Sequence, residues 1–255
     1  MRKFLTKGWL VRHALVVLAV IVLINLGLWQ LRRLDERRAL NATILAGLNG
    51  PVTALTGADV DPNALDFHRV TATGEFDNAQ SIVLRNQPFD LRPGVHLITP
   101  LRLDGSNRAV LVDRGWIPSD DAGRETRQVY NETGRVTVEG IAAKSQPRPD
   151  RFLVPTDPTP APPETRLDEW FRVDIERIQA QVPYPLLPIF IKQSPDKNAK
   201  PDTPPLRAEM IDLSEGPHLN YALQWFSFAI ILLVVYGTLL RREAKRDGNK
   251  HEQSK

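Results

Sequence analysis

The chain has 255 residues and a formal net charge of +3, with 33 Lys and Arg against 30 Asp and Glu, and its mean hydropathy of −0.27 is ordinary for a folded chain. So small a net charge gives no argument for nucleic-acid binding. Much of the basic excess lies at the two ends of the chain, which indicates membrane topology instead. Cysteine is absent from the sequence, which excludes disulfides, thiolate metal sites and cysteine nucleophiles.

The first apolar segment, ALVVLAVIVLINLGLWQL, covers residues 14–31 and follows a basic start at 1–13. As a helix with a rise of 1.5 Å per residue it spans about 27 Å, close to the thickness of the hydrocarbon core. A cleaved signal peptide is the alternative, but no A-x-A pattern follows and the run is longer than a usual signal-peptide core. We therefore predict an uncleaved transmembrane helix over 14–31 behind a cytoplasmic tail at 1–13.

The second apolar segment, YALQWFSFAIILLVVYGTLL, is again about one bilayer long and precedes a basic tail at 241–255. We predict a second transmembrane helix over 217–240, and the positive-inside rule places both termini in the cytoplasm. Arginines after the first helix favour the opposite orientation, but they belong to a long region, 32–216, and long regions cross the membrane largely regardless of charge. The basic start is too short for a mitochondrial transit peptide, so the sequence favours the plasma membrane of a bacterium.

The region 32–216 is long enough for one globular domain, which these predictions place outside the cytoplasm. It opens as a helix that continues from the membrane, with Leu34, Leu40 and Leu45 as its apolar side, and glycine and proline at 47–51 end it. Alternating or β-branched runs then predict antiparallel strands: FHRVTATGEF, SIVLRNQ, the hairpin GVHLITPLRLDGSNRAVLVDRGWIP, GRVTVEGIAAK and LPIFIKQ.

Two segments of this domain depart from the strand pattern. Residues 147–166 are too rich in proline for a core element and are expected to form an extended loop. The segment FRVDIERIQAQV predicts a short helix with Asp174 as its N-cap. The predicted fold class is therefore α+β: two transmembrane helices flanking an extracytoplasmic β-rich domain with antiparallel strands and a short helix.

No catalytic signature is visible in the sequence. The five histidines show no metal-ligand spacing, the glycines form no phosphate-cradling loop, and no serine lies in a nucleophile elbow. Paired carboxylates for hydrolysis are not excluded, but nothing selects a pair. We therefore predict that the protein is not an enzyme and has no catalytic residues.

The start of the second predicted helix carries an unusual group of side chains. Pro217 suits the first helical turn, so His218 lies where the positive end of the helix dipole disfavours its protonation. A neutral imidazole at the outer membrane face meets the requirement for an axial haem-iron ligand, and Tyr221 and Trp225 follow on the same face. The alternative is that these three side chains belong to an interfacial aromatic belt.

The outer end of the first predicted helix carries Trp29, Gln30, Arg32 and Arg33. With both termini inside, this end and the start of the second helix lie in the same leaflet, so cations and an amide can meet an imidazole and aromatic rings. The alternative is arginine snorkelling combined with helix packing, in which Gln30 and Gln224 supply polar contacts.

Four motifs in chain order resemble the surfeit locus protein 1 family, the membrane-anchored assembly factors of cytochrome c oxidase: GLWQLRR, RVTATGEF, VLVDRGWIP and HLNYALQWFSFA. The resemblance covers nearly the whole chain apart from the proline-rich segment and the basic C-terminal tail. The residues on these motifs are Gly27, Trp29, Gln30 and Arg33; Arg69, Gly74, Glu75 and Phe76; Arg114, Gly115 and Trp116; and His218, Tyr221, Ala222, Trp225 and Phe226.

The resemblance implies a protein that assists the delivery or insertion of haem a into the catalytic subunit of the oxidase, with haem a bound transiently. His218 is the expected ligand of the haem iron, and Arg33 and Arg32 are the expected partners of the propionates. The remaining residues of the expected haem site are Trp29, Gln30, Tyr221 and Trp225.

The implied partners are the catalytic subunit of the oxidase and the lipid bilayer, with haem a synthase as a further candidate and no nucleic acid. Two alternative functions remain. One is a scaffold that holds an oxidase subunit without haem. The other is a membrane-tethered hydrolase, which needs a carboxylate or serine site that the sequence does not display.

Overall fold

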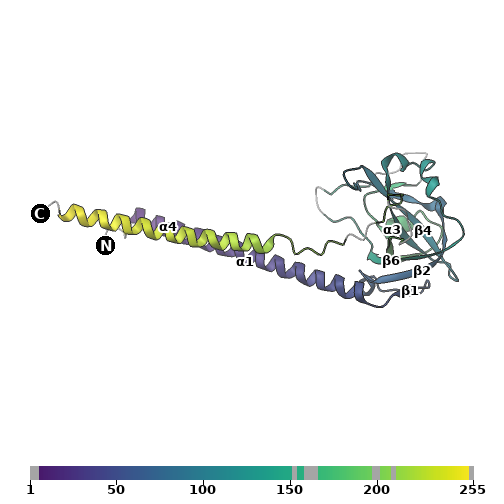
Figure 1. The fold of residues 1–255 in the computed structure, drawn as a ribbon, viewed down its shortest axis with the longest axis horizontal. Coiled ribbons are helices and arrows are strands. Elements are labelled where there is room, and N and C mark those ends of the chain that lie inside the picture. Colours follow the sequence, from purple (N-terminus) through teal and green to yellow (C-terminus); the bar gives the residue numbers. More distant parts are fainter. Residues whose placement is uncertain (1–5, 151–153, 158–165, 197–201, 208–210, 253–255) are drawn as a thin grey trace. The chain divides into compact units, whose positions relative to one another are not determined.

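A computed structural model describes residues 6–150, 154–157, 166–196, 202–207 and 211–252 (Figure 1). The chain divides into two compact units. The helix pair comprises Met1–Ala42 and Asp212–Lys255, and the barrel domain comprises Thr43–Ile211. The two ends of the chain therefore fold together, and the middle region forms a unit of its own.

The helix pair is built from α1, Lys7–Asn49, and α4, His218–Glu252. Among the described residues these two helices are long and apolar enough to cross a membrane. In the most apolar 18-residue stretch of each helix, only 11% of α1 and 6% of α4 is buried within the molecule. The core helix of a soluble protein buries most of such a window, so these exposed apolar surfaces favour contact with lipid. The predicted continuation of the first helix beyond its apolar segment is confirmed, since α1 ends at Asn49.

A seam of small and medium side chains is buried in the helix pair. On α1 the buried positions include Gly27, Gln30 and Leu34, and on α4 they include Ala222 and Ala229. Spacings of three, four and seven residues place these positions on one side of each helix. The seam is therefore the face along which each helix packs.

Gly27 makes close helix packing possible. A Cβ atom added at this position would lie 2.5 Å from Cε1 of Phe226, far inside van der Waals contact. Small residues at such crossings let two helices approach closely where lipid removes the hydrophobic drive to associate. The glycine and the aromatic ring are thus a matched pair.

The predicted apolar side of the continuing helix is only partly right. Leu34 is buried, but 42% of Leu40 and 43% of Leu45 is exposed. The buried positions that follow Leu34 are instead Asn41, one heptad further on, and Ile44. Leu40 is turned away from the seam by the helical period. Leu45 lies in the part of α1 that belongs to the barrel domain, where burial follows a different set of contacts.

The barrel domain is a sheet that closes on itself. Five strands form the ring: β2 Arg69–Phe76, β6 Arg135–Lys144, β8 Leu186–Gln193, β5 Ala109–Pro118 and β4 Gly94–Leu103. The ring closes because β2 pairs with β4 as well as with β6. The pairing of β5 with β8 is parallel, while the other pairings in the ring are antiparallel, so the barrel is mixed.

Short elements complete the domain. Three short strands extend the sheet: β1 Thr53–Leu55, β3 Ile82–Leu84 and β7 Glu169–Trp170. The two short α-helices are α2 Pro62–Leu65 and α3 Ile175–Gln179, and 3₁₀ turns lie at Asn78–Gln80, Ser119–Asp121 and Thr126–Tyr130. The α+β prediction with two flanking helices is confirmed, although the strands close into a mixed barrel.

Two local predictions have different outcomes. The side chain of Asp174 accepts a hydrogen bond from the backbone N–H of Arg177, so its role as the N-cap of α3 is confirmed. Much of the proline-rich segment, residues 151–153 and 158–165, lies outside the described residues. The expectation that it forms an extended loop therefore stays a prediction.

Glycine permits the barrel to close. Gly74 of β2 pairs with Leu103 of β4, and a Cβ atom added to it would lie within 1.9 Å of the carbonyl oxygen of Arg102. Only a residue without a side chain lets the two backbones come this close. The glycine in the motif RVTATGEF is thus explained by the fold.

Candidate functional site

One hydrogen bond joins the two predicted clusters at the membrane entry points. Nδ1 of His218, the first residue of α4, lies 2.8 Å from Oε1 of Gln30 on α1. Gln30 is 9% exposed and His218 is half-buried. The two residues are 188 positions apart in the sequence.

The partner atom determines which nitrogen of His218 is protonated. An amide oxygen only accepts hydrogen bonds, so Nδ1 of His218 must be the donor. In the neutral ring the proton on Nδ1 leaves Nε2 with a free lone pair. Histidines that bind metals are oriented in this way, through a hydrogen bond from the nitrogen that does not coordinate. The geometry therefore suits a metal-binding imidazole.

The predicted aromatic residues lie at different positions around the helix pair. Trp225 is half-buried on α4 and contacts the ring of Phe228 at 6.0 Å, edge to face. Tyr221 and Trp29 are 46% and 47% exposed. The exposed pair matches the expectation for an interfacial belt, while Trp225 lies nearer the seam that contains His218.

The predicted cationic residues are not equivalent. Arg33 pairs with Glu36 on the same helix at 2.6 Å, and both side chains are more than half exposed. Arg32 is exposed and makes no ion pair within the described ranges. It lies two positions after Gln30, and such positions point to different sides of a helix. The structure therefore brings Gln30 to His218 but turns Arg32 away from them.

Three further side chains on α1 hold the segment that leads into α4. Arg37 donates to the backbone oxygens of Ser214, at 2.9 Å, and Asp212, at 2.7 Å. Asn41 donates to the backbone oxygen of Leu213 at 2.6 Å. We call this set of contacts, together with the pair formed by Arg38, the clamp.

Arg38 completes the clamp with a bidentate ion pair. Its Nε and Nη2 donate to the two carboxylate oxygens of Glu215 at 2.8 and 2.9 Å. The hydrogen bond from Arg38 holds the pKa of Glu215 below its usual value, and the same contact raises the pKa of Arg38. Hydrogen bonds from Ser214 similarly lower the pKa of Asp212. The clamp therefore holds the chain just before His218.

The clamp gives a structural reason for the last two arginines of LRRLDERR, the segment that follows the apolar part of α1. Positions 34, 37, 38 and 41 follow the helical period, so Leu34, Arg37, Arg38 and Asn41 lie along neighbouring sides of α1. The clamp was not predicted from the sequence because its partners, in 212–215, are far away in the chain. Only the helical spacing of Arg37, Arg38 and Asn41 was visible there.

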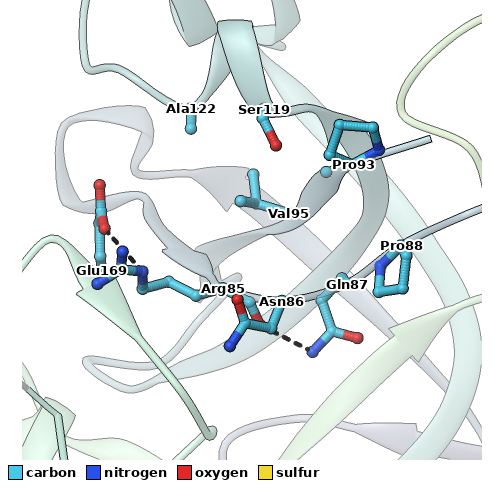
Figure 2. Close-up of a pocket in the computed structure, with 10 residues that line it drawn as sticks. Arg85, Asn86, Gln87, Pro88, Pro93, Val95, Ser119, Ala122 and Glu169 are labelled. Carbon is cyan, nitrogen blue, oxygen red and sulfur yellow. Dashed lines mark hydrogen bonds and ion pairs between the residues drawn. The ribbon is translucent and has the colours of Figure 1, made fainter.

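The barrel domain contains a hollow of about 490 Å³ between the segment 85–88 and the turn at Ser119. Figure 2 shows Ser119 and Ala122 on one side of it and Asn86 and Gln87 on the other. Its charged groups, Arg85 and Glu169, pair with each other at 3.1 Å. Among the described residues no group of three or more His, Cys, Asp or Glu could hold a metal ion. This hollow offers no chemistry comparable to that of His218.

Comparisons with known proteins agree with the motifs. The model of the SURF1 family matches residues 17–230. A SURF1-like protein of Monosiga brevicollis is 27% identical over 241 residues, covering 89% of this chain and 87% of its own. A SURF1-like protein of Rickettsia conorii is 27% identical over 231 residues, covering 89% and 90%. The Surfeit locus protein 1 of Arabidopsis thaliana is 23% identical over 281 residues, covering 87% and 76%.

Proposed function

Since the chain belongs to the SURF1 family, we propose that it is a membrane-anchored factor that assists the assembly of cytochrome c oxidase without catalytic turnover of its own. Family membership supports oxidase assembly as the process. The two exposed apolar helices support a membrane anchor. The proposed partners are the catalytic subunit of the oxidase and, as a donor of the haem, haem a synthase.

We propose the following topology: both termini in the cytoplasm of a bacterium and the barrel domain outside the plasma membrane. The basic C-terminal tail supports this orientation. Reporter fusions after Asn49 and after Lys245 test it. The fusion after Asn49 is expected to be active only outside and the fusion after Lys245 only inside, and the reverse pattern would contradict the proposal.

The cargo proposed for this factor is haem a, held while the catalytic subunit is built. The observation that carries the proposal is the hydrogen bond between His218 and Gln30, which directs the free lone pair of the imidazole to Nε2. His218 is thus the residue that would ligate the iron.

The side chains around His218 are proposed to receive the rest of the cargo. Trp225 offers an aromatic surface on the same helix, and Arg33 offers charge-assisted hydrogen bonds to a propionate in exchange for its exposed pair with Glu36. Trp29 and Tyr221 set the depth of the two helices in the membrane. Arg32, turned away from the seam, is proposed to contact lipid headgroups rather than the cargo.

The decisive experiment is to purify the full chain from cells that make haem a and to record its absorption spectrum. Stoichiometric haem a with the spectrum of a histidine-ligated iron is the expected result. A chain that carries no haem but still restores oxidase assembly would support the alternative function, a scaffold that holds an oxidase subunit. Restoration of assembly is measured separately, by oxidase activity in cells that lack the native factor.

A further inference from the structure

A second hollow in the barrel domain, of about 230 Å³, lies beside the motif VLVDRGWIP and is not used by the proposed haem function. Pro88 lines both this hollow and the one in Figure 2, so the two hollows adjoin at this residue. Its volume lies below the range of pockets that hold drug-sized ligands, so a ligand that fits is small.

A row of polar side chains crosses the floor of this hollow from strand to strand. Nδ1 of His96, on β4, lies 2.9 Å from Oδ2 of Asp113, on β5. Lys192, on β8, is the Cα partner of Asp113. The buried carboxylate of Asp113 also accepts the backbone N–H of Gly115 at 3.1 Å. Asp113 is thus held by hydrogen bonds from a side chain and from the backbone.

Two cations, Lys192 and Arg207, line this hollow beside the single carboxylate of Asp113. Lys192 makes no ion pair or side-chain hydrogen bond within the described part of the chain. Arg207 donates through Nε to the backbone oxygen of Arg114 at 3.0 Å, and its Nη2 lies 3.7 Å from Glu132. The same carboxylate serves Arg114 at 2.5 Å. One carboxylate therefore faces two guanidinium groups.

Burial of Arg207 adds to this imbalance. Burial is the main cause that lowers the pKa of Arg207, and the carboxylates of Glu132 and Asp196 only partly oppose it. An arginine stays charged in proteins, so the lowered pKa reflects a cation that has lost part of its hydration. An anion bound in the hollow would stabilise this cation.

Two aromatic rings form part of the wall of the hollow, and the guanidinium of Arg92 lies over both of them. The rings of Phe89 and Trp116 lie 5.8 Å apart, and Nε1 of Trp116 donates to the backbone oxygen of Gln87 at 2.7 Å. Gly115 has φ +113, and a Cβ atom there would lie 2.5 Å from the backbone oxygen of Leu206. The glycine therefore lets the segment that carries Leu206 pack against the barrel and close one side of the hollow.

From this arrangement we propose that the hollow binds the carboxylate of a small molecule that has an apolar body. Lys192 and Arg207 pair with the carboxylate, and Phe89 and Trp116 pack against the body. The proposal is independent of haem binding. It assigns the residues of the motif VLVDRGWIP to the construction of a ligand site rather than to the fold alone.

The test uses the full chain in lipid nanodiscs and isothermal titration calorimetry, with empty nanodiscs as the background. The probes are 3-phenylpropionate and its uncharged analogue, 3-phenylpropionamide. The carboxylate is expected to bind at least about tenfold more tightly than the amide, as the loss of a charge-assisted hydrogen bond predicts. Equal affinity for the two probes would overturn the proposal without the need for any variant.

Two substitutions then locate the site. Lys192→Met is expected to weaken binding of 3-phenylpropionate about tenfold. Lys144→Met is the matched control, because Lys144 lies on the neighbouring strand β6 and pairs with Asp66 outside this hollow, so affinity should be unchanged. Equal effects of the two variants would overturn the assignment. Competition by inorganic phosphate as strong as that by the carboxylate would also overturn it, because the apolar body would then contribute nothing.

Discussion

Each end of the helix pair carries a histidine that is hydrogen-bonded across to the other helix, yet the two bonds have different consequences. Nδ1 of His218 lies 2.8 Å from the amide oxygen of Gln30, and Nδ1 of His13 lies 2.7 Å from the hydroxyl of Tyr236. The amide oxygen only accepts, so Nε2 of His218 keeps its lone pair. The hydroxyl both donates and accepts, so it fixes neither tautomer of His13.

The surroundings of the two histidines differ as well. The ring of His13 packs against the rings of Trp9, at 6.0 Å, and Tyr236, at 5.8 Å, and Arg12 lies over the ring of Trp9. These contacts form an aromatic cluster at the end of the pair that carries the chain termini. A hydrogen bond of similar length therefore indicates a metal-binding histidine only where the partner atom fixes which nitrogen of the ring is the donor.

The largest effect is expected from removal of the proposed ligand. His218→Ala removes the imidazole, so haem a should be lost from the purified chain while the protein stays in the membrane at normal abundance. His13→Ala is the matched control and should retain haem a. The measurement is the ratio of haem to protein from the absorption spectrum, after correction for abundance. Equal haem content in His218→Ala and the parent would show that His218 is not the ligand.

A smaller effect is expected when only the orienting partner is removed. Gln30→Leu leaves the imidazole in place but frees its ring, so the affinity for haem a should fall by about 10–100-fold. Gln224→Leu changes an exposed glutamine on α4 and should have no effect. Haem titration of the purified variants in nanodiscs measures both. If the Gln30→Leu variant binds haem a as tightly as the parent, Gln30 does not orient the ring of His218 for metal binding.

The seam between the helices gives the third prediction. Gly27→Leu drives a side chain into the ring of Phe226, and overpacking of this kind destabilises by about 1–3 kcal/mol. Gly237→Leu is the control, since a Cβ atom at that position has no atom within 4 Å. The thermal midpoint of the full chain in detergent should fall for Gly27→Leu only. An unchanged midpoint would mean that the helices do not approach closely at Gly27.

The smallest effect is expected from the clamp, because its charged groups are exposed and solvent screens their interaction. The folded-state pKa of Glu215 lies below its usual value of about 4.3. The stabilisation is therefore complete above that usual value and is lost as the pH falls through the lowered pKa. Amide exchange of residues 213–218, corrected for the intrinsic effect of pH, should rise only at acidic pH.

Glu215→Gln should reproduce this faster exchange at neutral pH, since it removes the charge that Arg38 pairs with. Amide exchange around His13 serves as the internal control and should stay the same. Faster exchange in both regions would show that the substitution loosens the whole helix pair rather than the clamp.

The sequence alone determined the features that depend on neighbouring residues. Two apolar helices, the strands of the hairpin around Asp104 and the N-cap at Asp174 were all predictable, because hydropathy, turn chemistry and capping act over a few positions. The group at the start of α4 was also visible as a motif. The sequence could name His218 and Gln30 as candidates, although they are 188 positions apart.

Tertiary structure alone decided how these features combine. The closure of the barrel depends on Gly74 approaching Arg102, and the buried side of α1 beyond Leu34 depends on which unit covers it. The clamp on 212–215 and the hydrogen bond between His218 and Gln30 were likewise decided by the tertiary structure. Each of these results from contacts between residues far apart in the chain, and such contacts depend on how the elements pack, which no local pattern along the sequence records.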